Sequence, residues 1–224
     1  MFVKDCMTRH PVMVPPEMPV TEAQQVMTDH QIRHLPVVGD GKRLVGLITP
    51  QRLTLKTDTM ASLDVWEITR YISHLKVRDV MLKSVAHQII TTTPETTVEM
   101  AAREMTEHKV GCLPVLEDGV VVGIISQIDL LAALQEMLGL PSLGVRVTMR
   151  MPNTKGQFAA LTAAVAKHGL GIMGIGSFPS RRQPGYYDMV LKIPNASLEE
   201  VREIMSQVPE QEIVDIREAG TRSN

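Results

Sequence analysis

A serine and an aspartate three residues apart stand in the segment GIISQID, residues 123–129. If Ser126 and Asp129 begin a helix, their hydroxyl and carboxylate can accept hydrogen bonds from the two hydroxyls of a ribose, while free backbone N–H groups face phosphate. The same spacing is that of a capping box, in which the two side chains only close the helix end and contribute about 1 kcal/mol of stability. The two residues alone leave both interpretations open.

A near copy of this segment, GLITPQR, occupies residues 46–52 and has Thr49 where the other has Ser126. The copy carries Arg52 in the position of Asp129. A guanidinium group has hydrogen-bond donors only, so it cannot accept a bond from a ribose hydroxyl. We therefore expect one complete site, at Asp129, and a second that is either empty or turned toward an anion.

The two segments belong to an internal repeat, in which residues 3–53 correspond to residues 77–130. VKDCM returns as VRDVM, and HLPVV returns as CLPVL. In each copy an apolar stripe at helical spacing comes first, then two short aliphatic runs separated by a turn, and then a second helix. The pattern predicts one supersecondary unit, βαββα, present twice.

Apolar residues at helical spacing place the helices. The first helix of each copy carries Val20, Ala23 and Met27, or Val98, Ala101 and Met105. The last helix of the second copy carries Ile128, Leu131, Leu134 and Leu138 on one side, and Gly139 is expected to end it. Between the copies, residues 59–75 carry Val65, Ile68, Ile72 and Leu75. This spacing predicts an amphipathic linker helix.

The pattern changes in residues 144–219. Alternating, helical and aliphatic segments follow one another in the order βαββαβ, which is ferredoxin-like. Gly169, Gly171 and Gly174 match the dinucleotide-binding spacing, but that motif needs a strand before it and a helix after it. The predicted order here is the reverse, so we take these glycines as a helix stop and as places where backbones approach closely.

Composition excludes several classes of function. The net charge of −2 and the 3% of aromatic residues argue against nucleic-acid binding. No apolar run approaches the roughly 20 residues that span a bilayer, and the N-terminus lacks an apolar signal core, so we expect a cytoplasmic protein without a membrane partner. Cys6 and Cys112 are expected to be reduced thiols. No nucleophile, base or metal-ligand set stands out, and we expect neither a catalytic cofactor, a metal site nor an enzyme.

The repeated motifs resemble those of the CBS (cystathionine-β-synthase) domain, which occurs in tandem as a Bateman module. The resemblance rests on h-x-D-x-M, h-P-V-V and G-h-h-[ST]-x-x-D, which occur in this order in both copies, apart from Arg52 at the last D of the first copy, and cover residues 1 to about 138. In that family the paired clefts bind AMP, ADP, ATP or S-adenosylmethionine as regulatory ligands. The resemblance therefore implies an adenine nucleotide as the ligand, held between the two copies.

Carried over by position, the resemblance assigns residues to both clefts. The nucleotide-binding set is Asp129, Ser126, Ile124, Pro15, Val20, Ile32, Arg33 and His34. The second, modified cleft is expected to use Thr49, Leu47, Arg52, Thr93, Val98, Val110 and Gly111. In the first set the acid and the hydroxyl would hold the ribose, aliphatic side chains the base, and basic residues the phosphate.

The last region is similar to the ACT domain, a ferredoxin-like module that often binds amino acids at a dimer interface. MPNTKGQFAAL resembles its first strand, ligand loop and helix start, with Asn153 as a polar contact and Gly156 allowing a close approach. The expected domains are a CBS domain over 1–58, a linker helix over 59–75, a CBS domain over 76–139 and an ACT domain over 144–219.

This order of domains resembles AcuB-type proteins, which are associated with acetoin utilisation. The expectation is a regulatory sensor of an adenine nucleotide, and of an amino acid or other metabolite, that forms a homodimer or higher oligomer and acts on an unidentified target. The alternative is a scaffold protein whose ligand sites are vestigial, in keeping with Arg52.

Overall fold

The computed structural model describes residues 1–53, 74–83, 89–140 and 142–220. The chain divides into two compact units, Met1–Leu130 and Leu131–Asn224. The predicted linker helix over 59–75 lies almost wholly outside the described residues.

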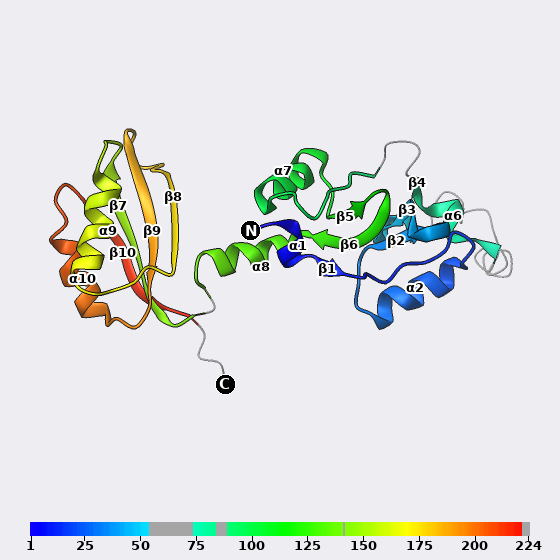
Figure 1. Cartoon of the computed structure of the whole chain (residues 1–224), viewed down its shortest axis with the longest axis horizontal. Coiled ribbons are helices and arrows are strands. Elements are labelled where there is room, and N and C mark those ends of the chain that lie inside the picture. Colours follow the sequence, from blue (N-terminus) through cyan, green and yellow to red (C-terminus); the bar gives the residue numbers. More distant parts are fainter. Residues whose placement is uncertain (54–73, 84–88, 141, 221–224) are drawn as a thin grey trace, which may run out of the picture. The chain divides into compact units, whose positions relative to one another are not determined.

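The first unit contains both repeats (Figure 1). The first repeat supplies α1 (Val3–Cys6), β1 (Thr8–Arg9), α2 (Val20–Asp29), β2 (Leu35–Val38), η1 (Asp40–Lys42), β3 (Leu44–Ile48) and α3 (Pro50–Leu53). The second supplies α6 (Val77–Val80), β4 (Leu82–Lys83), α7 (Val98–His108), β5 (Cys112–Glu117), β6 (Val120–Ser126) and α8 (Gln127–Met137), which continues into the second unit. The predicted βαββα repeats are confirmed, with an additional helical turn before each first strand.

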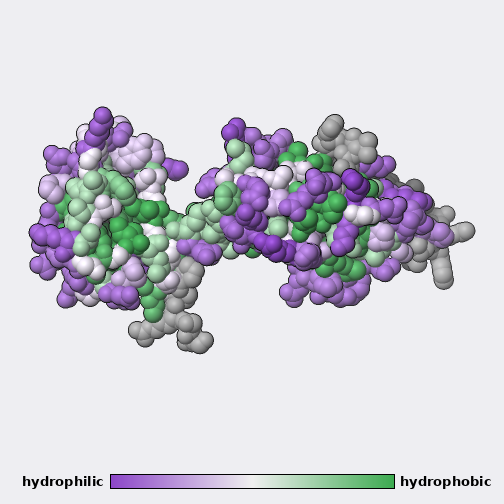
Figure 2. Space-filling view, viewed as in Figure 1, coloured by the Kyte–Doolittle hydropathy of each residue, from purple (hydrophilic) through white to green (hydrophobic). Residues whose placement is uncertain are grey.

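The predicted stripes of α2 and α7 form the cores of the two repeats. The stripe residues Val20, Ala23, Met27, Val98, Ala101 and Met105 are all buried. The outward face of α2 is hydrophilic (Figure 2). On α8, in contrast, Ile128, Leu131 and Leu134 are exposed, and Ala133 is the buried residue of that helix.

The two repeats exchange their first elements. Strand β1 pairs with β6 of the second repeat, and β4 pairs with β3 of the first, giving the sheets β1-β6-β5 and β2-β3-β4. Val3 is completely buried in the core around Met105, while Val77 is completely buried in the core around Ala23. Each repeat's core is thus completed by the start of the other.

Two of the motifs that the copies share take part in this exchange. Asp5 accepts a hydrogen bond from the backbone N–H of Phe2 at 2.7 Å and so caps α1, as Asp79 caps α6. Met7 lies over Gly123, where a Cβ atom would come within 2.5 Å of its sulfur. Because only glycine leaves room for this methionine, the h-x-D-x-M motif of one repeat and the G-h-h motif of the other are two sides of one contact.

The second unit has the predicted order βαββαβ. Its elements are β7 (Gly144–Pro152), α9 (Gln157–Lys167), β8 (Gly174–Pro179), β9 (Tyr186–Ile193), α10 (Leu198–Ser206) and β10 (Glu212–Ala219). The strands form one antiparallel sheet, β10-β7-β9-β8, with α9 and α10 on one face (Figure 1). The ferredoxin-like prediction is confirmed.

The structural roles predicted for Gly169, Gly171 and Gly174 are confirmed for the first and the last of these glycines. Gly169 has φ of +71° just after α9, and Gly174 begins β8, so the helix does come before the strand. A Cβ atom on Gly174 would collide with the backbone of Leu138, which is a close approach. Gly171 has no atom within 4 Å of such a position, so close approach does not explain it.

Candidate functional site

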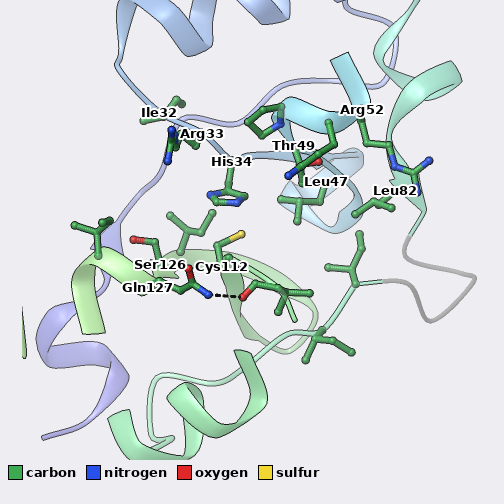
Figure 3. Close-up of a pocket in the computed structure, with 18 of the residues that line it drawn as sticks. Ile32, Arg33, His34, Leu47, Thr49, Arg52, Leu82, Cys112, Ser126 and Gln127 are labelled. Atoms are coloured by element: carbon green, nitrogen blue, oxygen red, sulfur yellow. Dashed lines mark hydrogen bonds between the residues drawn. The ribbon is translucent and has the colours of Figure 1, made fainter. Parts of the chain in front are cut away.

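A cleft of about 870 Å³ lies within the first unit, and its walls come from both repeats (Figure 3). Its volume falls in the range of about 300–1,000 Å³ that is typical of small-molecule sites. Except for Ile89 and Ile90, its lining residues occupy corresponding positions of the two copies. The pairs are Thr8 with Leu82, Gln31 with Lys109, Ile32 with Val110, Arg33 with Gly111, His34 with Cys112, Leu47 with Ile124, Thr49 with Ser126, Pro50 with Gln127, Gln51 with Ile128, and Arg52 with Asp129. The two clefts expected from the sequence are therefore two halves of one cavity.

Ser126 and Asp129 stand at the start of α8 and form a capping box. Oδ2 of Asp129 accepts hydrogen bonds from the backbone N–H and from the hydroxyl of Ser126, both at 2.7 Å, and the N–H of Asp129 donates to Ser126 Oγ at 3.4 Å. The capping interpretation is thus confirmed as a description of the free protein. Oδ1 of Asp129 has no partner in the described part of the chain, so one carboxylate oxygen is still available in the cleft.

The start of α8 is also tied to the loop before β5. The N–H of Gln127 donates to Gly111 O at 3.1 Å, and its side-chain amide donates to Val110 O at 3.3 Å, the bond dashed in Figure 3. The backbone N–H groups of Gln127 and Asp129 are therefore already engaged within the protein. Because these two N–H groups are engaged, we expect side-chain cations to contribute most of the binding of a phosphate in the cleft.

Such cations are present. Arg33, Arg52 and Lys109 line the cleft, and none of them forms an ion pair with a carboxylate among the described residues. Against these three positive charges, Asp129 is the one carboxylate among the described lining residues. The cleft therefore favours an anionic ligand. Figure 3 shows Arg33 and Ser126 toward the same end of the view, whereas Arg52 lies toward the other end.

His34 lies between the two halves of the cleft. Its ring faces Gly111, where a Cβ atom would come within 3.1 Å of Nε2, so a side chain at residue 111 would press on the imidazole. Burial, and secondarily the neighbouring Arg33, lower the pKa of His34 below its ordinary 6.5. The ring is consequently neutral near pH 7 and ready to gain a proton if an anion is placed beside it.

The remaining lining is mainly apolar. Aliphatic side chains reach the cavity from both repeats: Ile32, Leu47, Leu82, Ile89, Ile90, Val110 and Ile124. The thiol of Cys112 is 3% exposed, and burial raises its pKa to about 12, so it does not act as a nucleophile at neutral pH. Apolar walls with a few polar groups suit a flat heterocycle joined to a polar, charged tail.

Most of the predicted site residues lie in this cavity. From the first predicted set it collects Asp129, Ser126, Ile124, Ile32, Arg33 and His34, and from the second it collects Thr49, Leu47, Arg52, Val110 and Gly111. It does not collect Pro15, Val20, Thr93 or Val98. Val20 and Val98 are each 4% exposed and belong to the helix stripes, while Pro15 and Thr93 are exposed outside the cleft.

Sequence reasoning missed several lining residues. Among them are Thr8, Leu82 and Lys109. Lys109 could have been found from the repeat. It directly precedes the predicted Val110, as Gln31 directly precedes the predicted Ile32, so the two residues occupy equivalent positions beside predicted site residues. Thr8 and Leu82 enter only through the exchange of first strands, which no local pattern reveals.

The residues predicted for a ligand of the second unit lie in the exposed loop between β7 and α9. The N–H of Asn153 donates to Gly185 O at 2.9 Å. Gly156 has φ of +91° and no protein atom within 4 Å of a Cβ position. Its conformation, rather than a close approach of another part of the chain, is what favours glycine here.

The described residues contain neither a metal-binding cluster nor a membrane-spanning helix. No group of three or more histidine, cysteine, aspartate or glutamate side chains there is arranged to hold a metal ion. None of the described helices has the length and apolarity needed to cross a membrane.

Comparison with solved structures gives likenesses that agree with this fold. A structure described as a putative acetoin utilization protein (AcuB) from Vibrio cholerae is 28% identical, with a TM-score of 0.51, and the match covers 62% of this chain and 94% of that one. The CBS-pair protein CBSX2 from Arabidopsis thaliana is 29% identical with a TM-score of 0.50, over 60% of this chain and 94% of the other.

Curated relatives are similar over a comparable share of the chain. The CBS domain-containing protein YhcV of Bacillus subtilis is 29% identical over 57% of this chain and 81% of its own length. A homoserine O-acetyltransferase of Methanohalobium evestigatum is 28% identical over 60% of this chain, but this chain spans only 24% of that protein. The model of the CBS domain family matches residues 3–55 and 77–136, the two repeats that build the cleft. The chain therefore belongs to the CBS domain family and carries a tandem pair of these domains.

Proposed function

We propose that the tandem CBS pair binds an adenine nucleotide in the cleft between the repeats, and that the protein is a non-catalytic regulator. The observation that carries this proposal is the composition of the cleft. The hydroxyl of Ser126, the carboxylate of Asp129, a set of aliphatic side chains and three cations that form no ion pair among the described residues line one cavity of about 870 Å³.

Each part of a nucleotide has a matching group. Oδ1 of Asp129, which has no partner among the described residues, can accept a hydrogen bond from a ribose hydroxyl, while Oδ2 stays with Ser126. Ile124 and the aliphatic residues facing it can hold the two faces of a purine. Arg33 and His34 line the cleft from the opposite repeat (Figure 3), and they are the groups that we propose for the phosphate.

The regulatory role is proposed because both repeats contribute walls to the cleft. A ligand that touches both repeats stabilises the arrangement of the pair that it fits best, and it shifts the population toward that arrangement. The second unit, residues 144–219, would act as an ACT domain that senses a small metabolite such as an amino acid or supports self-association, in an AcuB-like protein. The ferredoxin-like sheet supports this part of the proposal.

A thermal-shift screen followed by titration calorimetry tests the nucleotide proposal. Purified protein is screened with AMP, ADP, ATP and S-adenosylmethionine, with UMP and UTP as controls that have the same phosphates but another base. At a ligand concentration a hundred times Kd, binding stabilises the folded state by about 2.7 kcal/mol, which is a shift of several degrees. Absence of binding by every adenine compound at millimolar concentration would reject the proposal and favour the scaffold alternative.

A further inference from the structure

The two halves of the cleft differ most at one pair of positions. Asp129 and Arg52 occupy equivalent places in the repeat, and both line the same cavity. Their neighbours are closely matched, since Ser126 corresponds to Thr49 and Ile124 corresponds to Leu47. The repeat therefore keeps the hydroxyl and the aliphatic wall, while it replaces the hydrogen-bond acceptor by a cation.

The replacement removes one ligand class from the Arg52 half and favours another. A guanidinium group has no lone pair to offer a ribose hydroxyl, but it binds phosphate oxygens through paired N–H donors. Arg52 forms no ion pair in the described part of the chain, so its charge is not already neutralised there. Lys109 lines the same cavity and is likewise unpaired among the described residues.

The charge of the cavity suits a phosphate group, and the positions of its cations indicate how many phosphates it can hold. Three cationic side chains against one carboxylate leave a net charge of about +2 among the described lining residues at neutral pH. A phosphate monoester supplies roughly −1.5 to −2, so a nucleoside monophosphate already balances this net charge, and the charge count alone does not favour a longer phosphate chain. Figure 3 places Arg33 and Arg52 toward different ends of the cleft, which suits a chain of phosphates better than a single one.

We infer that Arg52 is a specificity-determining residue that selects nucleotides with more than one phosphate. On this inference, which rests on the proposed nucleotide function, the cleft holds one nucleotide per chain. Its nucleoside lies at Ser126 and Asp129, and its terminal phosphates extend toward Arg52. The two halves of the cavity then serve one ligand instead of two symmetric ones.

The test is titration calorimetry of AMP, ADP and ATP against the wild-type chain and the variants Arg52→Gln and Arg52→Lys. For the wild type, we expect one nucleotide per chain and an affinity that rises from AMP to ATP. Arg52→Gln should lower the affinity for ATP about tenfold and leave that for AMP within about twofold, because a charge-assisted hydrogen bond at a partly exposed site lies at the lower end of its usual range. Arg52→Lys should restore most of the preference for ATP, because it restores the charge.

Arg103→Gln is the matched control, because Arg103 is an exposed arginine on α7 that pairs with Glu107 outside the cleft. This control should bind all three nucleotides as the wild type does. Two AMP molecules per chain, equal affinities for AMP and ATP, or an equal loss of both in Arg52→Gln would overturn the inference while the nucleotide function stands. Failure of the wild type to bind the three nucleotides and S-adenosylmethionine would reject the nucleotide function itself.

Discussion

Replacing Asp129 by asparagine separates the two roles that its position allows. Asparagine keeps one side-chain oxygen, which can accept the hydrogen bond that Asp129 Oδ2 takes from the N–H of Ser126 at 2.7 Å. The other end of the amide is a donor, so it cannot accept a bond from a ribose hydroxyl in place of Oδ1. Loss of a charge-assisted bond is worth about 1.5–3 kcal/mol, and we therefore expect nucleotide affinity to fall about ten- to a hundredfold.

Stability provides the second readout. Asp129→Asn retains the helix cap and should lower the free energy of unfolding by only a few tenths of a kcal/mol, whereas Asp129→Ala loses the cap as well and should cost about 1 kcal/mol. Asp79→Ala is the matched control, because Asp79 caps α6 by accepting from the N–H of Lys76 at 3.0 Å and does not line the cleft. It should cost stability without changing affinity.

The measurements are calorimetric titration with the nucleotide bound best by the wild type, and urea denaturation of each variant. If Asp129→Asn and Asp129→Ala both bind as the wild type does while only Asp129→Ala loses stability, Asp129 is a helix cap alone. That result would refute the assignment of Oδ1 to the ribose.

Three further predictions concern other residues of the first unit. Burial holds the pKa of His34 below 6.5, and a phosphate beside the ring should raise that pKa, so nucleotide binding should take up protons near pH 6 and become tighter as the pH falls. Calorimetric titration in buffers of different ionisation enthalpy measures this proton uptake. Identical binding heats in all buffers would contradict the prediction. Gly123→Ala should lower the free energy of unfolding by about 1–3 kcal/mol, because the added Cβ overpacks against Met7. Gly171→Ala should be nearly neutral in the same urea denaturation, because a Cβ at residue 171 meets no atom within 4 Å. A neutral Gly123→Ala would show that the contact with Met7 is not tight. In a Cys6→Ser variant, a thiol reagent at pH 8 should label Cys112 slowly in the folded protein and rapidly in urea. The reason is that burial raises the pKa of the Cys112 thiol to about 12. Rapid labelling without urea would show that this thiol is not protected.

The sequence was sufficient for the elements because their signals are local. Helical stripes such as Val98, Ala101 and Met105 each lie within one segment, and all three are buried as that spacing predicts. The order of the ferredoxin-like unit followed in the same way from alternation and helix signals. Periodicity reports which face of an element is buried, and each element is long enough to show it.

The partners of those elements could not be read in the same way. Neither VKDCM nor the strand that follows it shows from its sequence that this strand joins the sheet of the other repeat, because the exchange depends on chain topology. For the same reason Pro15 and Thr93 were assigned to a cleft that they do not line, whereas Leu82 was overlooked. The state of Asp129 was left open by its spacing, since a capping bond and a ligand bond use the same carboxylate.

The exchange of first elements also determines how the chain can be divided. A single repeat cut out of this protein would have a hole in its core where Val3 or Val77 belongs, and its central strand would have an unpaired edge. Two copies of such a fragment could fill each other's holes and so rebuild the pair from separate chains. The smallest autonomous piece of this unit is therefore the reciprocal pair, whether its halves are joined by a peptide or not.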